Sequence, residues 1–340
     1  MRFRSGPSIT VLAVALSLAF APGAVRAQTI KLATLAPQGS VWDTSLREMA
    51  ARWAKETGGR VELRLYPGGV SGDEMDTVRK MRIGQFQGAA LSVAGLAEIE
   101  PAFKLFHVPL LVDSWDELGH VLAGLRPDLE RRLEERGYVL LLWGHGGWVH
   151  LFSRQPIRTI DDLKGQKMFV WAGDDATVQL WRRNGFQPVP LAATDVLIGL
   201  ETGMIDVVPT TPIAALSLQW YRQTPYMQNL GLAPLVGAVV VSKKSWEKIP
   251  APDREKLLAA ARAAEQRLWA EIPKQDAEAL EQMKQRGLNV VEVPEAARSA
   301  WREAADRFVG EVRTEDVPPA ILAAARAAIA EFRANGGTAP

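Results

Sequence analysis

Short apolar segments alternate with amphipathic helical segments near the start of the chain, and this alternation restricts the fold more than any other sequence feature. Residues 29–34, 61–66 and 88–92 have the pattern of strands. Ser40 is the expected N-cap of the helix between the first two, and residues 71–74 fit a capping box that opens the next helix. Strands joined by helices at this spacing form a mainly parallel sheet with helices on both faces. The sequence therefore predicts an α/β fold.

A second α/β pattern follows farther along the chain. The apolar run 138–143 predicts a central strand, and the glycine-rich segment 144–147 is expected to break it and let the chain turn between two lobes. Strand and helix patterns then alternate again. The further expected helices lie at 115–124, 127–136, 174–184 and 193–202, and the further expected strands at 148–152, 167–171, 205–208 and 238–241.

A long amphipathic pattern covers Asp253 to Arg286 in the helical C-terminal third. A helix of these 34 residues would span about 51 Å. That length exceeds one small domain, so the helix is expected to cross from one lobe to the other, and Pro273 is expected to kink or split it. The alternative is a surface helix packed within one domain.

The first 27 residues have the pattern of a secretory signal peptide. Arg2 and Arg4 precede the apolar run 9–20, and the small-residue site at residues 25–27 follows it. The run is short for a membrane span of about 20 residues, so cleavage after about Ala27 is favoured over an N-terminal anchor. These residues carry three arginines and no acid, so their removal changes the net charge from +1 to −2. The expected location is the periplasm.

Length and composition exclude several classes of protein. A chain of 340 residues suggests about two domains, and 47% hydrophobic residues are ample for a core. The chain has no cysteine, which excludes a disulfide scaffold, a thiol nucleophile and a cysteine metal site. The charge pattern shows no basic block of the kind that binds nucleic acid.

The motifs of common enzymes are also missing from the sequence. His145-Gly146-Gly147 resembles an oxyanion segment of lipase-like hydrolases, but no G-x-S-x-G nucleophile motif accompanies it. His145 and His150 lack the spacing of a zinc motif, and no nucleotide-binding glycine motif is present. We therefore expect no catalytic residue, no metal and no cofactor.

Four segments, in their order and spacing, carry a resemblance over essentially the whole chain after the leader. They are Tyr66-Pro67 with Gly72-Asp73-Glu74, residues 106–111 (FHVPLL), residues 161–168 (DDLKGQKM) and residues 200–206 (LETGMID). Together they resemble the DctP-like periplasmic substrate-binding proteins of tripartite ATP-independent periplasmic (TRAP) transporters. The resemblance implies a two-lobe periplasmic binding protein of the type II kind that closes on a ligand and performs no chemistry on it.

The sequence departs from the family at the positions that the resemblance places in the cleft. The family motif D-L-K-G-x-K-[ILM]-R ends in an arginine that clamps the substrate carboxylate, and Phe169 stands there in this chain. A second position that is often arginine is Val149, and the family's aromatic and asparagine positions are Ala193 and Thr211. Trp171 shares the strand face of Phe169 by the two-residue period. The candidate ligand-binding residues are Leu35, Ser92, Val149, Phe169, Trp171, Ala193, Thr210, Thr211 and Trp220.

These departures predict a roomy, apolar and aromatic cleft. A carboxylate taken from water needs a paired charge or several hydrogen bonds, which Phe169 and Val149 cannot supply. The first hypothesis is therefore a largely apolar, aromatic, amphipathic or lipid-like ligand. A second is an ordinary organic acid with a basic residue at a shifted position, for which the candidates are Lys167, Arg182, Arg183 and Arg222. An exported hydrolase and a purely structural adaptor are alternatives of other classes.

The resemblance also implies partners and lobe limits. TRAP binding proteins deliver their ligand to membrane permease subunits, and family members with apolar clefts work with a tetratricopeptide-repeat partner protein. The expected first lobe comprises residues 28–148 plus about 237–272. The expected second lobe comprises residues 149–236 plus about 273–340.

Overall fold

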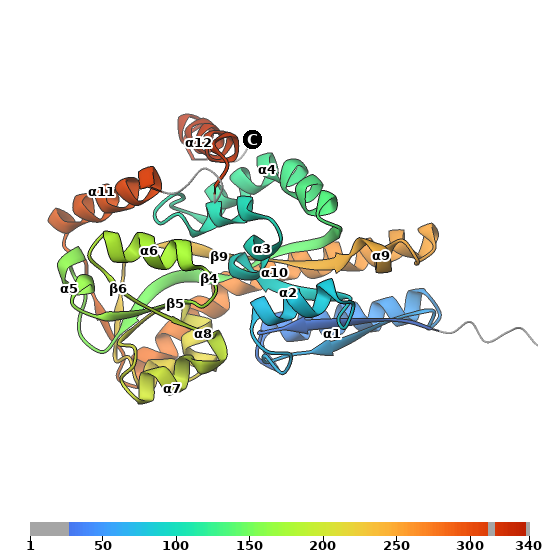
Figure 1. The fold of residues 1–340 in the computed structure, drawn as a ribbon, viewed down its shortest axis with the longest axis horizontal. Helices are drawn as coiled ribbons and strands as arrows, with labels where there is room; N and C mark the ends of the chain where they lie inside the picture. The colour runs from blue at the N-terminus through green and yellow to red at the C-terminus, as the bar shows by residue number, and fades with distance from the viewer. Residues whose placement is uncertain (1–26, 312–316, 338–340) are drawn as a thin grey trace, which may run out of the picture.

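The computed structural model describes residues 27–311 and 317–337 of the chain. The predicted signal peptide, apart from its last residue, lies outside these residues. The described part folds into two α/β lobes that share one ten-stranded mixed sheet (Figure 1). Within the described ranges, no helix has both the length and the apolar character needed to cross a membrane.

The first lobe is built on a parallel three-stranded core, as the alternating pattern predicts. Strands β1 (Gln28–Thr34), β2 (Val61–Tyr66) and β3 (Gly88–Ser92) lie in the order β2-β1-β3, and β1 is parallel to both neighbours. The helices that join and follow them are α1 (Val41–Glu56), α2 (Glu74–Arg82), α3 (Val93–Ile99), the 3₁₀ helix η1 (Pro101–His107) and α4 (Trp115–Glu135).

Two long antiparallel strands connect the lobes. β4 (Tyr138–Ser153) pairs with β9 (Ala233–Ser242), β9 also pairs with β3, and the end of β4 pairs with β7 (Val207–Thr210). The prediction that residues 144–147 break the strand is wrong, because β4 runs through them with a register shift between His145 and Trp148. Gly144 lies opposite Gly237, and a side chain at Gly144 would come within 2.7 Å of the Trp42 ring. Because Gly144 has no side chain, the Trp42 ring can pack directly on the paired backbones of β4 and β9.

The second lobe continues the sheet in the order β4-β7-β5-β6. Its main strands are β5 (Lys167–Trp171), β6 (Gln187–Leu191) and β7 (Val207–Thr210), and the short strands β8 (Tyr226–Gln228) and β10 (Asn289–Val291) pair beside β4. Its helices are α5 (Ile160–Lys164), α6 (Asp175–Arg183), η2 (Ala193–Asp195), α7 (Val196–Glu201), α8 (Pro212–Ser217) and η3 (Trp220–Arg222). Thr159 caps α5 in a full capping box with Asp162.

The long C-terminal helix crosses from lobe to lobe. After the short α9 (Lys243–Trp246), α10 (Ala251–Gln285) is one helix with Pro273 inside it, so the proline does not split it. Leu257 and Leu268 of α10 belong to a hydrophobic cluster of the first lobe, and Met283 belongs to a cluster of the second. Helix α11 (Glu295–Glu311) then lies over the second lobe above α6, and α12 (Pro319–Ala334) packs on α4 (Figure 1).

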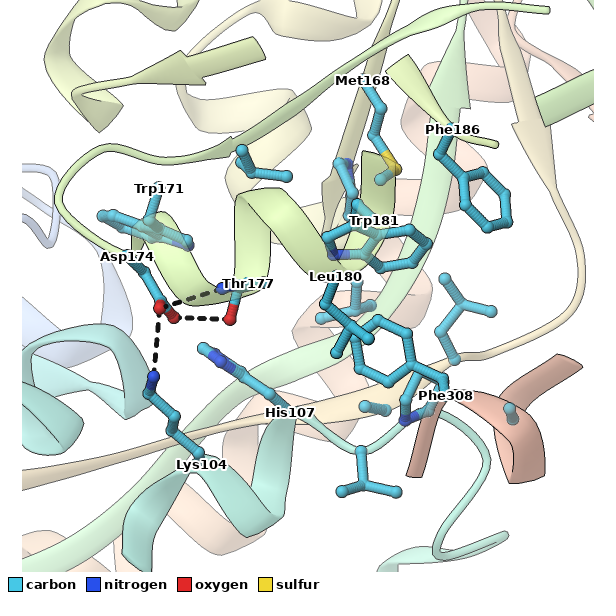
Figure 2. A pocket seen from close by; sticks show the side chains of 18 of the residues that line it. Lys104, His107, Met168, Trp171, Asp174, Thr177, Leu180, Trp181, Phe186 and Phe308 are labelled. Atoms are coloured by element: carbon cyan, nitrogen blue, oxygen red, sulfur yellow. Dashed lines mark hydrogen bonds and ion pairs between the residues drawn. The ribbon is translucent and has the colours of Figure 1, made fainter. Parts of the chain in front are cut away.

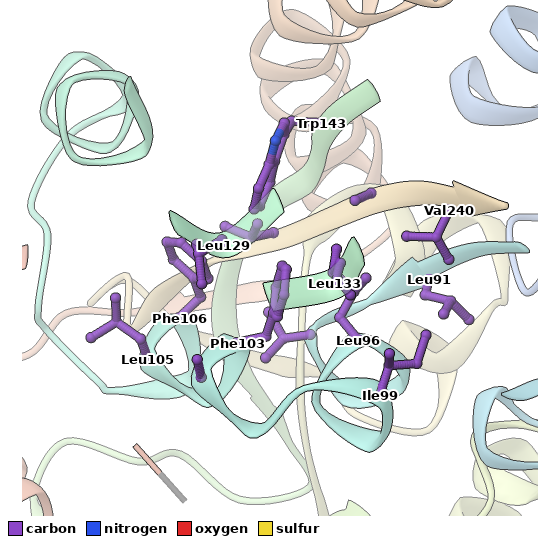
Figure 3. Packing of buried hydrophobic residues seen from close by; sticks show 14 of the residues in the cluster. Leu91, Leu96, Ile99, Phe103, Leu105, Phe106, Leu129, Leu133, Trp143 and Val240 are labelled. Carbon is purple, nitrogen blue, oxygen red and sulfur yellow. The ribbon is translucent and has the colours of Figure 1, made fainter. Parts of the chain in front are cut away.

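Alternate side chains of the strands point to opposite faces of the sheet and pack into a hydrophobic core on each face. In β9, Ala238 and Val240 face α3, α4 and η1, while Val239 and Val241 face α1 and α10. Figure 3 shows the first of these cores, in which Phe103 stacks on Trp143 with ring centroids 5.6 Å apart. In a chain without disulfides, these two cores hold the first lobe together.

Two predictions of helix boundaries are wrong. Residues 115–135 form the single helix α4 with Pro127 inside it, instead of two helices separated near that proline. Helix α2 is capped by Asp73 and begins at Glu74, so Ser71 is not the cap. The Ser71 hydroxyl is instead within 3.2 Å of the Thr77 hydroxyl on α2.

Candidate functional site

A cavity of about 820 Å³ lies between the lobes and extends beneath α11. The first lobe contributes α3 and η1, the second lobe contributes β5 and α6, and α11 supplies the outer wall. Figure 2 shows that the cavity has a polar end at the N-terminus of α6 and an aromatic end farther along that helix.

The polar end holds an ion pair between the lobes. Lys104 Nζ on η1 lies 3.0 Å from Asp174 Oδ1. Asp174 is also the N-cap of α6, because its carboxylate accepts hydrogen bonds from the backbone N–H and the hydroxyl of Thr177. Both charged side chains are about four-fifths buried. The pair and the capped helix therefore form a charge-balanced polar wall.

His107 faces the cavity beside this wall. Its side chain is exposed to the cavity, but the cavity itself is enclosed by protein on most sides. The resulting desolvation of the charged form lowers the pKa of His107 to about 4. The imidazole is therefore neutral at pH 7 and can both donate and accept a hydrogen bond.

The aromatic end is formed by rings from three segments. Trp181 on α6 meets Phe186 edge to face with ring centroids 4.8 Å apart, and Phe308 on α11 lies 4.9 Å from the same indole. Leu180 and Met168 are almost fully buried beside these rings. This end of the cavity has the lining expected for an apolar group of a ligand.

Three of the predicted binding residues contact the cavity, namely Val149, Phe169 and Trp171. Phe169 and Trp171 lie on one face of β5 with ring centroids 5.7 Å apart, as the two-residue period predicts. The Phe169 side chain is only 5% exposed and belongs to a hydrophobic cluster that also contains Trp220. The Phe169 ring is therefore anchored in the core of the second lobe.

Leu35 and Ala193 lie where the lobes touch. The backbone N–H of Ala193 donates a 3.3 Å hydrogen bond to Asp73 Oδ2 of the first lobe. A side chain at Gly69 would come within 3.2 Å of Leu35 and 3.1 Å of Thr194, so the two rims of the lobes are in close approach there. These contacts describe a closed arrangement of the lobes.

Two of the three predicted hydroxyl residues, Ser92 and Thr211, cap helices in this arrangement. Ser92 Oγ caps α3 and donates a 2.8 Å hydrogen bond to Glu74. Thr211 caps α8 by accepting from the N–H of Ala214, and it is fully buried. Thr210 is buried at the end of β7. The cavity lining does not include these three side chains or those of Leu35, Ala193 and Trp220.

The carboxyl group of Glu74 is a buried acid at the base of the first lobe. It accepts hydrogen bonds from the N–H and hydroxyl of Ser92 and from the N–H of Gly95. Burial raises its pKa to about 7 despite these three donors. The geometry assigns it to holding α2 against α3.

The cationic residues considered for an anionic ligand divide into two groups. Lys167 lies at the N-terminal end of β5, where its ammonium contacts the carbonyl of Gly203 and lies 3.8 Å from Asp206, so it is directed away from the cavity. Arg183 contributes to the cavity lining from the end of α6. Arg182 and Arg222 do not line the cavity.

Sequence reasoning missed the residues that form most of the cavity wall. His107 lies in the 106–111 segment, which by itself assigns it no role, and the helical pattern of 174–184 does not indicate that Trp181 lines a cavity. Nothing in the sequence near Phe308 or Lys104 indicated a site, since each lies on an ordinary amphipathic segment. Among the described residues, no group of three or more histidine, aspartate or glutamate side chains could hold a metal ion.

Comparison with known proteins identifies the family. The model of the bacterial extracellular solute-binding protein family 7 (DctP) matches residues 32–315. A solute-binding protein of Chromohalobacter salexigens is 29% identical over 67% of this chain and 69% of its own length. The 2,3-diketo-L-gulonate-binding periplasmic protein of Escherichia coli is 22% identical over 88% of this chain and 91% of its own length.

Solved structures share the fold. The sugar acid binding protein of Advenella mimigardefordensis in complex with galactonate superposes with a TM-score of 0.84 at 19% identity, covering 90% of this chain and 98% of that one. A TRAP solute-binding protein from Ralstonia eutropha with bound (S)-2-acetolactate gives 0.81 at 23% identity, covering 89% and 99%. The family consists of binding proteins of transporters and not of enzymes, as the sequence predicts. The chain belongs to the bacterial extracellular solute-binding protein family 7 and is a solute-binding protein of the TRAP type.

Proposed function

We propose that this protein captures a largely apolar, aromatic or amphipathic ligand between its lobes and delivers it to the membrane permease of a TRAP transporter. The observation that carries the proposal is the size and lining of the cavity, which has about 820 Å³ and an aromatic far end. At about 30 Å³ per water-sized group, it has room for roughly two dozen non-hydrogen atoms. A hexuronic acid would fill about half of that space.

The position of Phe169 supports the same proposal. Its ring is packed among apolar side chains, so the second lobe offers no guanidinium fork to a carboxylate at this point. An apolar group avoids the cost of desolvating a charge that lacks a partner. Selectivity then comes from the shape of the cavity and from the polar wall at Lys104 and Asp174.

A second candidate ligand is an organic acid. Relatives have been solved with bound D-glucuronate and L-gulonate. In this chain Lys104 reaches the cavity, so an acid that replaced Asp174 as its partner would find a basic group at a position other than that of the family motif. Strong dependence of binding on ionic strength would favour this candidate.

The location and partners complete the proposal. We place the mature protein in the periplasm after cleavage near Ala27, acting with permease subunits and with a tetratricopeptide-repeat partner protein. Lobe I would comprise residues 28–148 plus about 237–272, and lobe II residues 149–236 plus a segment that starts near residue 273 and ends with α11 near residue 311, instead of the limit at 340 that the sequence suggested. Helix α12 returns to the first lobe, where Ile321 and Ala325 pack in its core.

The test is to identify what the protein carries. Protein purified from the periplasm is denatured, and the released small molecules are analysed by mass spectrometry beside protein refolded without ligand. We expect a molecule with a substantial apolar or aromatic part. Recovery of a small dicarboxylate or a sugar acid alone, with rebinding of that acid by the refolded protein, would refute the apolar ligand and support the second candidate.

A further inference from the structure

The aromatic end of the cavity is a distinct region of it, which we call the distal chamber. It is bounded by Met168, Leu180, Trp181, Phe186 and Phe308. In Figure 2 these side chains gather on one side of His107, and Lys104, Asp174 and Trp171 lie on the other. Rings therefore dominate the far end of the cavity along α6, where Arg183, Asn184 and Glu311 also contribute to the lining.

Helix α11 contributes Phe308 to the wall of the chamber, and this side chain can be substituted without changing a core residue. Trp301 and Ala305 are its buried residues, and Trp301 Nε1 donates to the carbonyl of Arg158. At the far end, Asn184 Nδ2 donates to Glu311 with a separation of 3.0 Å. Phe308 is half-buried between these two attachments and directs its ring at Trp181. Its ring lines the chamber without forming part of the lobe's core.

We propose that the distal chamber binds the apolar chain of an amphipathic ligand and that Phe308 sets the chain length accepted. This inference rests on the proposed function and makes it more specific. The head group of such a ligand lies at the polar wall, where the hydroxyl of Thr177, neutral His107 and the Lys104–Asp174 pair offer hydrogen bonds. The chain then extends along α6 past Leu180 to the three rings.

The two ends of the cavity support this orientation over its reverse. A chain directed at the polar wall would desolvate the Lys104–Asp174 pair without replacing its contacts with water, which is unfavourable. A polar head directed at Trp181 and Phe186 would meet rings first, and of the polar side chains at that end Asn184 and Glu311 already bond each other, which leaves a basic group such as Arg183 as its partner. Each buried methylene of the chain would instead strengthen binding about fourfold.

The experiment measures the binding of straight-chain alkanoates and 1-alkanols of about four to about ten carbons by titration calorimetry on ligand-free protein. For the unmodified protein we expect affinity to rise about fourfold per methylene and then level off when the chamber is full. Phe308→Trp should level off at a shorter chain, and Phe308→Ala should accept a longer one. Val309→Ala, one residue away on α11 and outside the cavity lining, is the matched control and should follow the unmodified protein.

The outcomes separate this inference from the proposed function. If an apolar ligand co-purifies but the levelling-off point is the same in both Phe308 variants, the role of the chamber is wrong and the proposed function stands. If neither probe series binds and a sugar acid does, both fail. Circular dichroism and melting curves show whether each variant is folded, and Phe308→Leu, which keeps an apolar side chain, should give an intermediate limit if Phe308→Ala is unfolded.

Discussion

Asp276 joins three elements at the junction of the lobes, and its ionisation is expected to change the stability of the protein. The side chain comes from the crossing helix α10 and is only 8% exposed. Its two oxygens accept 3.1 Å hydrogen bonds from the N–H of Trp148, at the register shift of β4, and from the N–H of Ile213, at the start of α8. The Asp276 carboxylate also fills the space beside Gly147, because a Cβ atom at residue 147 would lie 2.5 Å from it.

Burial raises the pKa of Asp276 from 3.8 to about 6, although the two backbone hydrogen bonds act in the opposite direction. A folded-state pKa above the unfolded value means that the folded protein binds this proton more tightly. The stability that this group contributes is therefore fully present below about pH 4 and is lost as the pH rises through about 6. The difference amounts to about 3 kcal/mol.

Asp276→Asn removes the charge and keeps the size of the side chain. One of the two backbone N–H groups would then face an amide NH₂ and lose its acceptor, at a cost of about 1–3 kcal/mol. We expect the variant to be less stable than the unmodified protein near pH 4.5 and about equally stable near pH 7.5, because the charge penalty offsets the lost hydrogen bond there.

Urea unfolding at several pH values measures this difference directly. Other titrating groups, such as Glu74, cancel when the variant is compared with the unmodified protein at each pH. Asp161→Asn is the matched control, since that carboxylate is 91% exposed and should show no such dependence. A stability difference between Asp276→Asn and the unmodified protein that stays constant from about pH 4.5 to about pH 7.5 would refute the reasoning.

Three further predictions concern the lobes and their junction. Lys104→Met should weaken ligand binding about tenfold in calorimetry by removing the ion pair that joins the closed lobes, while Lys244→Met on α9 should not; equal affinities would contradict this role. Phe169→Arg should lower the free energy of unfolding by at least about 3 kcal/mol and lower the affinity for the native ligand more than tenfold. An unchanged free energy of unfolding in urea would show that the ring is not part of the core. Gly147→Ala should lower the free energy of unfolding by about 3 kcal/mol or more, because φ is +110° there and the Asp276 side chain fills the space. Gly124→Ala, which lies on α4 with open space around it, should raise the free energy of unfolding by about 0.5–1 kcal/mol. Thermal melts of the two variants measure both changes.

The strands and helices of this fold are largely visible in the sequence, and the failures have a common cause. Residues 61–66 and 88–92 form strands within the predicted bounds because their apolar side chains feed the cores of the sheet. The helix α4 continues through Pro127 and the strand β4 continues through residues 144–147. In both places the local sequence predicts a break, but tertiary packing overrides it. Contacts with distant elements cannot be inferred from neighbouring residues alone.

Periodicity predicted the part of the candidate site that lies on β5, and Val149 on β4 followed only from the resemblance to the family. The two-residue period places Phe169 and Trp171 on one face of β5, and they lie there. Lys104 and Asp174 are 70 residues apart in the chain, and Trp181 and Phe308 are farther apart still. No periodicity links such positions, because the approach of η1 and α11 to α6 follows from the packing of whole elements.

On the proposed function, a ring at Phe169 in place of a guanidinium would change how a binding protein of this kind holds its closed form. An arginine that clamps a carboxylate supplies directional contacts that exist only when ligand and lobe meet. An apolar ligand supplies burial, which is strong but has no direction. In this structure the directional contacts between the lobes come from the protein itself, through the Lys104–Asp174 ion pair and the hydrogen bond from Ala193 to Asp73. If the ligand is apolar as proposed, these two contacts would fix the geometry of closure, the ligand would supply the burial that favours closing, and the cavity would select the ligand by its shape.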